Sequence, residues 1–107
     1  MEPKFFAQHW VNEDGNPSGG VTSGRGFTIS WQNGPLLDED GMRKEPNGAF
    51  VEDVIRAAVD RLGFYQSGKF ACEQNEIALR HLLEALEALE KRTQERRERG
   101  VEGTWQV

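Results

Sequence analysis

Four leucines, spaced three, four and three residues apart, constrain the fold of this chain more than any other feature. The row consists of Leu79, Leu82, Leu86 and Leu89. This spacing returns to one face of an α-helix about every 3.5 residues, which is the pattern of a coiled-coil seam. It predicts a helix from about Ala71 to Arg99, with Gly100 as its C-terminal cap. The row is long enough to serve both a helical hairpin and an interface between chains.

A second apolar row precedes this helix and predicts another one. Its members recur at spacings of three and four residues, and they are Phe50, Val51, Val54, Ile55, Ala58, Leu62 and Tyr65. Asn47 fits the N-cap of this helix. Glu52 and Asp53 fall in its early turns, where the helix dipole favours negative charge. The polar turn Gln66–Lys69 contains glycine, so the sequence predicts an antiparallel two-helix hairpin over about residues 47–99.

The N-terminal third carries strand patterns instead. Phe5–Val11 is rich in aromatic and β-branched residues, and Phe27–Gln32 alternates apolar and polar side chains, which is the period of a strand with one buried face. The stretch Asn12–Gly20 between them is dominated by turn formers and predicts a loop. Asn33–Pro35 ends the second strand, because proline cannot donate a hydrogen bond to a sheet.

Together these patterns predict the fold class α+β. N-terminal antiparallel β-strands are followed by a long antiparallel two-helix hairpin, and the chain is oligomeric. At 107 residues the chain is expected to form a single domain, residues 1–107. We expect the β-strand region at about 4–35, a loop at 36–46, the hairpin at about 47–99 and a C-terminal tail at 100–107.

Composition and charge exclude several classes of protein and favour association between chains. With 36% hydrophobic and 29% charged residues, a lone monomer would have a thin core and would gain from association. The net charge of −5 argues against a general nucleic-acid coat, which needs a broad basic surface. Cys72 is the only cysteine, so no intrachain disulfide is expected. The sequence has no membrane-span or signal-peptide pattern, which favours a cytosolic protein without membrane partners.

Motifs for catalysis or metal binding are not found. His9 and His81 lie in different predicted elements, with no cysteine or carboxylate at metal-ligand spacing. The glycines of the N-terminal third lack the strand-then-helix setting of a dinucleotide fingerprint, and no nucleophile-plus-base pattern is present. The sequence therefore predicts a binding protein that is not an enzyme and has no metal and no cofactor.

A cationic stretch near the end of the second helix is the best candidate for a site. It contains Lys91, Arg92, Arg96, Arg97 and Arg99 against Glu95 and Glu98. Cations at a helix C-terminus complement its dipole, which explains Lys91, Arg97 and Arg99 without any site. Arg92 and Arg96 lie four residues apart on one face, with Arg96 on the leucine row. A phosphate site and an ordinary polar helix end both remain open for this pair.

Several segments resemble a known family. They are Phe27–Pro35, Phe64–Gln66, Lys69–Asn75, Leu82–Leu86, Lys91–Thr93 and Arg99–Thr104. Together they resemble the phage Thoeris anti-defence family of the first type, which is related through its helical hairpin to the phage anti-CBASS sponges. The resemblance implies a sponge that binds cyclic ADP-ribose isomers without cleaving them, in the cytoplasm of the infected bacterial host. It also implies that CBASS cyclic di- or trinucleotides are further possible ligands.

The resemblance also suggests which residues bind the ligand. The base-stacking aromatic falls on Tyr65 or Phe64, the hydrogen bonder to base or ribose on Asn75, and the phosphate binders on Arg92 and Arg96. Asn75 and Arg92 are 17 positions apart, roughly 25 Å along one helix at 1.5 Å per residue. One chain therefore cannot close this site, and an antiparallel two-fold dimer would supply two identical sites.

The implied assembly is a homo-oligomer, either a dimer or a hexamer built from three dimers, with a small cyclic nucleotide as its partner and no nucleic-acid polymer. The alternative, drawn from the basic stretch without the family, is a dimeric helical-hairpin interaction or nucleic-acid-binding module.

Overall fold

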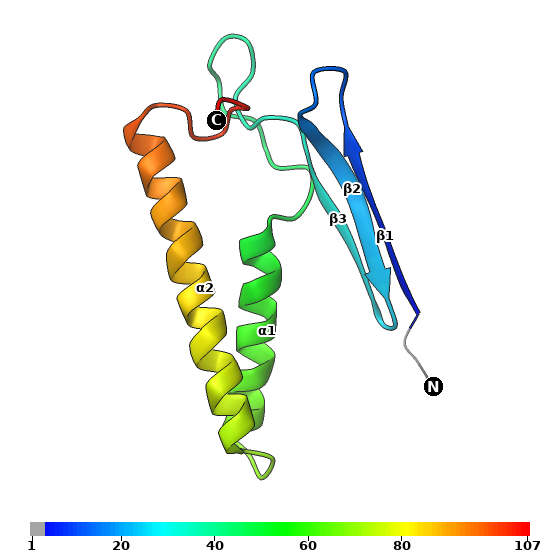
Figure 1. Ribbon diagram of the computed structural model, residues 1–107, viewed down its shortest axis with the longest axis vertical. Coiled ribbons are helices and arrows are strands. Elements are labelled where there is room, and N and C mark those ends of the chain that lie inside the picture. The colour runs from blue at the N-terminus through cyan, green and yellow to red at the C-terminus, as the bar shows by residue number, and fades with distance from the viewer. Residues whose placement is uncertain (1–3) are drawn as a thin grey trace. The chain divides into compact units, whose positions relative to one another are not determined.

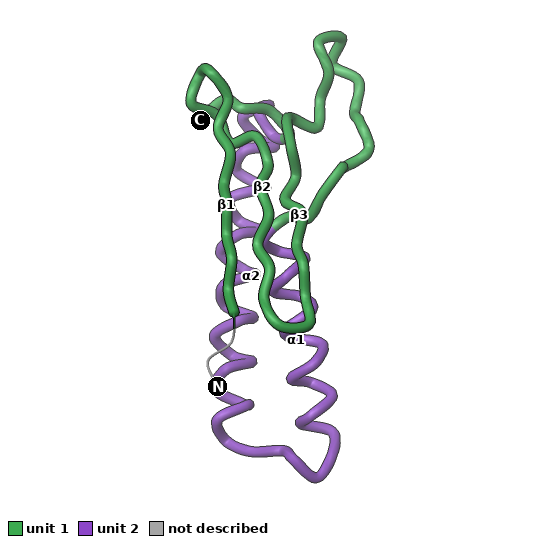
Figure 2. The backbone as a smooth tube through the Cα atoms, turned by 90° about the vertical axis from the view of Figure 1, so that its right-hand side faces the viewer, with its two compact units in different colours: residues 1–50, 103–107 green, residues 51–102 purple. Residues whose placement is uncertain are grey.

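The computed structural model describes residues 4–107, in which three strands precede two helices (Figure 1). The elements are β1 (Phe5–Val11), β2 (Pro17–Gly24), β3 (Phe27–Asn33), α1 (Val51–Gln66) and α2 (Glu73–Glu98). The predicted α+β class is confirmed. The chain divides into two compact units (Figure 2): the chain up to Phe50 together with Gly103–Val107, and Val51–Glu102. Whether the whole chain behaves as the expected single domain stays a prediction.

The sheet is antiparallel in the order β1-β2-β3, with β2 in the middle. The prediction of a loop as far as Gly20 was wrong, because β2 begins at Pro17. Gly19 and Gly20 are buried and have φ values of +93° and +146°, which L side chains rarely adopt. A Cβ added to Gly20 would run into the backbone oxygen of Gln8 on β1. These glycines therefore allow close strand approach, a role that turn propensity does not reveal.

The alternating pattern of β3 agrees in part with its burial. Ile29 and Trp31 are half-buried and Thr28 is exposed, while Phe27 at the start of the strand remains 45% exposed. The Trp31 indole Nε1 donates a hydrogen bond to Thr22 Oγ1 on β2 at 2.8 Å. The predicted shared face is thus clearest at its last two positions.

Asn47 does not cap a helix, and this prediction was wrong. Helix α1 begins only at Val51. The Asn47 side chain instead pairs with the backbone of Asn33 at the end of β3: its Oδ1 accepts from Asn33 N and its Nδ2 donates to Asn33 O, both at 2.8 Å. Ala49 continues this contact by pairing with Trp31 as an isolated bridge. The segment before α1 is therefore held along β3 and is not yet helical.

The helical hairpin agrees with its prediction. Helices α1 and α2 run antiparallel and pack together, joined by a short turn after Gln66 (Figure 1). Leu86 is buried, and Leu79, Leu82 and Leu89 are half-buried, so the leucine row forms the packed face of α2. Gly100 follows the helix with a φ of +73°, as expected for a C-terminal glycine.

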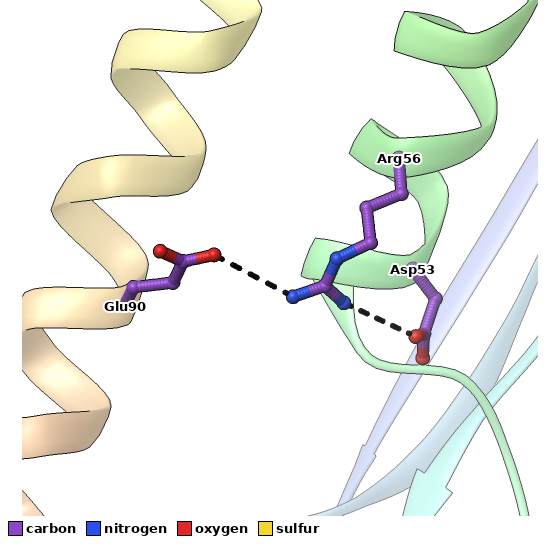
Figure 3. Close-up of polar contacts among 3 residues, drawn as sticks. All are labelled: Asp53, Arg56 and Glu90. Carbon is purple, nitrogen blue, oxygen red and sulfur yellow. Dashed lines mark ion pairs between the residues drawn. The ribbon is translucent and has the colours of Figure 1, made fainter.

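An ion-pair bridge fixes which ends of the two helices are neighbours. Arg56 on α1 lies between Asp53, one turn earlier, and Glu90 on α2, with N···O distances of 3.7 and 3.8 Å (Figure 3). All three side chains are more than half exposed, so the pairs contribute at most about 1 kcal/mol. They show that the beginning of α1 faces the arginine-rich part of α2.

The core is thin, as the composition predicted. Among the described residues, the buried hydrophobic side chains are Leu36, Leu86 and Val101. Large apolar side chains such as Phe64, Phe70 and Leu83 are 63%, 69% and 52% exposed on the helical unit. Association would cover such surface, and it stays a prediction. In the described part of the chain, neither helix has the length and apolar character needed to cross a membrane.

Candidate functional site

The aromatic half of the predicted site lies in the last turns of α1. Phe64 and Tyr65 have ring centres 6.1 Å apart and ring planes tilted by 53°. Phe64 is exposed, whereas Tyr65 is half-buried. Both rings are accessible at the turn end of the hairpin, so the geometry leaves both available for stacking on a base.

Arg61 joins these two rings, and the sequence analysis did not select it. Its guanidinium carbon lies 5.1 Å from the centre of the Phe64 ring and 5.0 Å from that of Tyr65. Its Nε donates a hydrogen bond to the Tyr65 hydroxyl at 3.2 Å. The sequence spacing of Arg61 to Phe64 and Tyr65 could have predicted these contacts, because residues three and four positions apart are neighbours on a helix.

Asn75 lies in the first turn of α2, close in sequence to the same end of the hairpin. It is half-buried, and its Nδ2 donates to the backbone oxygen of Phe70 at 3.4 Å. The turn is also held by Gln66, which accepts from Cys72 N at 2.9 Å and donates to Cys72 O at 3.1 Å. Asn75 thus has a defined position beside the turn, and its Oδ1 is the acceptor that could meet a ligand donor.

The arginine half of the predicted site lies at the other end of α2. Arg92 is exposed, and its side chain has no recorded hydrogen bond or ion pair with any residue of 4–107. Arg96 is half-buried, and its Nη2 donates to the backbone oxygen of Val101 at 3.1 Å. The Val101 amide in turn donates to Arg96 O at 2.9 Å. The Arg96 side chain therefore also holds the segment that follows α2, which the spacing argument missed.

Two other cations of this stretch, Arg97 and Arg99, contact residues of α2. Arg97 donates to Gln94 Oε1 at 3.3 Å, and Arg99 lies 3.7 Å from a Glu95 carboxylate oxygen. Arg92 and Arg96 lie one helical turn apart, about 6 Å along the axis at 1.5 Å per residue. Two guanidinium groups at this spacing can bind neighbouring phosphates of one pyrophosphate.

A single chain does not bring the two halves together. Helix α2 is continuous from Glu73 to Glu98, so the separation of roughly 25 Å between Asn75 and Arg92 holds in the folded chain. The bridge from Arg56 to Glu90 places the start of α1 beside the arginine end, whereas Tyr65 is in its last turn. The structure groups Phe64 and Tyr65 on one turn, with Asn75 across the loop, and it keeps them apart from Arg92 and Arg96.

A hollow of about 400 Å³ lies along α2 and is lined by none of the predicted site residues. Its lining is Glu76, Leu79, Arg80, Leu83, Glu84 and Glu87. Three carboxylates against one guanidinium repel an anionic ligand. The hollow is thus unsuited to phosphate, and the functional candidates remain the two ends of the hairpin.

Within residues 4–107, no three His, Cys, Asp or Glu side chains gather as a metal site would require. The predicted site residues supply ring faces, an amide and guanidinium groups. These groups recognise bases and phosphates, and none of them is a carboxylate, an imidazole or a thiol.

Comparisons with known proteins identify the family to which the helical hairpin belongs. The model of the Acb2/Tad1 hairpin domain matches residues 24–94, which include β3, both rings, Asn75 and Arg92. The protein Thoeris anti-defense 1 of Bacillus phage SBSphiJ7 is 40% identical to this chain over 82 residues. That match covers 77% of this chain and 54% of the relative, so the chain spans about half the length of the relative it matches. The resemblance to a phage Thoeris anti-defence family is confirmed, and the chain belongs to the Acb2/Tad1 hairpin-domain family.

Proposed function

We propose that this protein is a phage anti-defence sponge, which binds a cyclic nucleotide immune signal of the bacterial host and holds it without cleaving it. The expected ligands are cyclic ADP-ribose isomers, with CBASS cyclic di- and trinucleotides as further candidates. Family membership supports this role, as does the 40% identity to a protein named Thoeris anti-defense 1.

The pairing of Arg92 with Arg96 is the observation that carries the proposal. Arg92 is exposed, and Arg96 is half-buried one helical turn further along, where its Nη2 donates to Val101 O. Arginine binds phosphate through two parallel hydrogen bonds, and two such groups one turn apart suit a pyrophosphate. This end of the hairpin is expected to bind the anionic part of the ligand.

The base would then bind at the turn end of the hairpin of the partner protomer. A base stacked on an aromatic ring gains about 1 to 3 kcal/mol, and both Phe64 and Tyr65 lie where such stacking is open. Because Asn75 and Arg92 of one chain are roughly 25 Å apart, a ligand of mononucleotide size needs the turn of one protomer beside the arginine end of its partner. An antiparallel dimer would meet this requirement with two equal sites.

The chemistry of the predicted site favours capture over hydrolysis. General acid–base catalysis requires a group that titrates near the working pH, usually a histidine or a carboxylate with a shifted pKa. The residues assigned to the site are aromatic, amide and guanidinium groups, which hold a ligand and do not transfer its protons. The bound signal molecule would therefore not be cleaved, and it would be released chemically unchanged.

Titration calorimetry tests the proposal directly. Purified protein is titrated with cyclic ADP-ribose, its isomers, and cyclic di- and trinucleotides, and at least one is expected to bind at micromolar concentration or tighter. The complex is then heat-denatured, and the released ligand is analysed by mass spectrometry. No binding by any of them would reject the sponge, and recovery of a degraded ligand would indicate an enzyme.

The nucleic-acid-binding alternative rests on the same basic stretch. Its cations are interspersed with carboxylates, one of which pairs with Arg99, and the chain carries a net charge of −5. Non-specific DNA binding depends on many phosphate contacts and is therefore strongly salt-sensitive. A gel-shift assay at low salt is expected to show no DNA binding, and strong salt-sensitive binding would favour the alternative.

A further inference from the structure

Arg61 differs from Arg56 and Arg99, two other arginines of the helical unit, in its contacts. Arg56 and Arg99 each lie within 3.8 Å of a carboxylate oxygen. Arg61 has no recorded ion pair with any carboxylate of residues 4–107, and its recorded partners are the two rings and the Tyr65 hydroxyl. An exposed guanidinium thus lies over two aromatic side chains, without an ion pair to a carboxylate of the described residues.

We infer that Arg61 is a third ligand-binding cation, which contacts a phosphate of the same nucleotide whose base stacks on Phe64 or Tyr65. This inference rests on the proposed function. It adds to the turn end of the hairpin a charge that the predicted residues there, an amide and two rings, do not have.

The geometry supports this role through the placement of the guanidinium. Its carbon lies about equally far from both ring centres, at 5.1 and 5.0 Å. A base stacked on either ring carries its phosphate one ribose away, and we expect the guanidinium over these rings to reach that phosphate.

The hydrogen bond to Tyr65 leaves most of the guanidinium available. Among residues 4–107, the recorded hydrogen bond of this side chain uses Nε, at 3.2 Å, and the two terminal nitrogens carry four further N–H donors. Those donors form the planar fork that binds phosphate in a bidentate manner. The contact with Tyr65 therefore orients the side chain without using the part that recognises an anion.

A ligand contact by Arg61 would also change which protomer binds which part of the ligand. With the predicted residues alone, one protomer would bind the base and its partner would bind all the phosphates. With Arg61, each turn end recognises a base together with its phosphate, and the arginine end of the partner binds the remaining charge. The ligand class is then a nucleotide with phosphate attached to the stacked nucleoside, not a neutral nucleoside.

The test compares Arg61→Gln with the wild type by titration calorimetry, using the tightest binder among the cyclic ADP-ribose isomers and 3′,3′-cyclic di-AMP. The matched control is Arg80→Gln, which removes one positive charge from an exposed arginine of α2 outside the predicted site. Arg61→Gln is expected to weaken binding about tenfold or more, since a charged hydrogen bond is lost. Arg80→Gln is expected to stay within about twofold of the wild type.

Salt dependence separates ligand contact from ring support. The affinity is measured at about 50 mM and about 300 mM NaCl, where screening differs strongly. Arg61→Gln is expected to show a smaller loss of affinity with salt than the wild type, because one ion contact is missing. A Tyr65→Phe variant keeps the ring and removes the hydroxyl acceptor, and it is expected to retain the wild-type salt dependence.

Three outcomes would overturn the inference. Arg61→Gln could bind as tightly as the wild type, or it could bind more weakly with an unchanged salt dependence, which would mean that Arg61 only supports the rings. In both cases binding by the wild type leaves the proposed function standing. A wild-type protein that binds none of the probes would reject the proposed function, and this inference with it.

Discussion

Replacing Arg92 and Arg96 by alanine, one at a time, distinguishes ligand capture from a structural role at the end of α2. Arg96 donates to Val101 O at 3.1 Å from a half-buried position, so Arg96→Ala removes a charged hydrogen bond at the end of α2. Such a bond contributes about 1.5 to 3 kcal/mol when well buried, and partial exposure brings it to about 1 kcal/mol. Arg96→Ala should therefore lower both stability and ligand affinity.

The expected shift in melting temperature follows from chain length. Unfolding entropy is about 2.1 cal/mol/K per residue, or about 0.22 kcal/mol/K for 107 residues. A loss of about 1 kcal/mol then lowers the Tm by about 4 °C for Arg96→Ala. Arg92 is exposed and has no recorded side-chain partner among residues 4–107, so Arg92→Ala should change stability by less than about 0.5 kcal/mol.

Both variants are measured by thermal unfolding without ligand, by light scattering and by titration calorimetry. We expect both to keep the oligomeric state of the wild type and to lose ligand capture, with only Arg96→Ala melting early. Arg80→Ala is the matched control for removing an exposed arginine and should match the wild type in every measurement. Equal melting temperatures for the two variants would refute a stabilising role for the bond from Arg96 to Val101, and dissociation of either would show that the arginines hold the assembly together.

Three further predictions concern packing. Leu86→Asp puts a charge at the buried position of the leucine row and should dissociate the assembly and abolish binding together; an intact oligomer by light scattering would contradict the seam assignment. Gly20→Ala should lower the free energy of unfolding, measured by chemical denaturation, by more than about 2 kcal/mol, because its Cβ would meet the Gln8 backbone. The control is Gly15→Ala, whose Cβ meets nothing; it should lower the free energy of unfolding by about 1 kcal/mol, from its φ of +80° alone. Similar costs for the two glycines would rule out the close approach of β1. Arg56→Ala removes the exposed ion pairs of Figure 3 and should lower the free energy of unfolding by less than about 1 kcal/mol. It should not affect ligand binding, and a large loss of affinity in titration calorimetry would disprove this.

Where hydrophobic periodicity was strong, the sequence was sufficient to predict the fold. The leucine row and the apolar row before it repeat at helical spacing, and both helices and their antiparallel connection are as expected. The strand at Pro17–Gly24 was missed because its glycines resemble a turn in sequence. Only the paired strands show that Gly20 is needed where two backbones approach closely.

The candidate site divides in the same way. Spacing along one helix places Arg92 and Arg96 on adjacent turns and separates them from Asn75, since the rise of a helix is constant. Sequence alone did not single out the partners of these side chains. Arg96 binds Val101 because the chain turns back after Gly100. Arg61 contacts both rings within α1, which helical spacing allows but which was not predicted.

What the sequence by itself determined is therefore periodic and local: two helices, the turn between them, and which side chains share a face. What only the tertiary structure decided depends on contacts across different elements, namely the glycine strand at the centre of the sheet and the pairing of Asn47 with β3. The physical reason is that periodicity follows from the fixed geometry of a single element. Close approach and hydrogen-bond partners depend on where two elements meet.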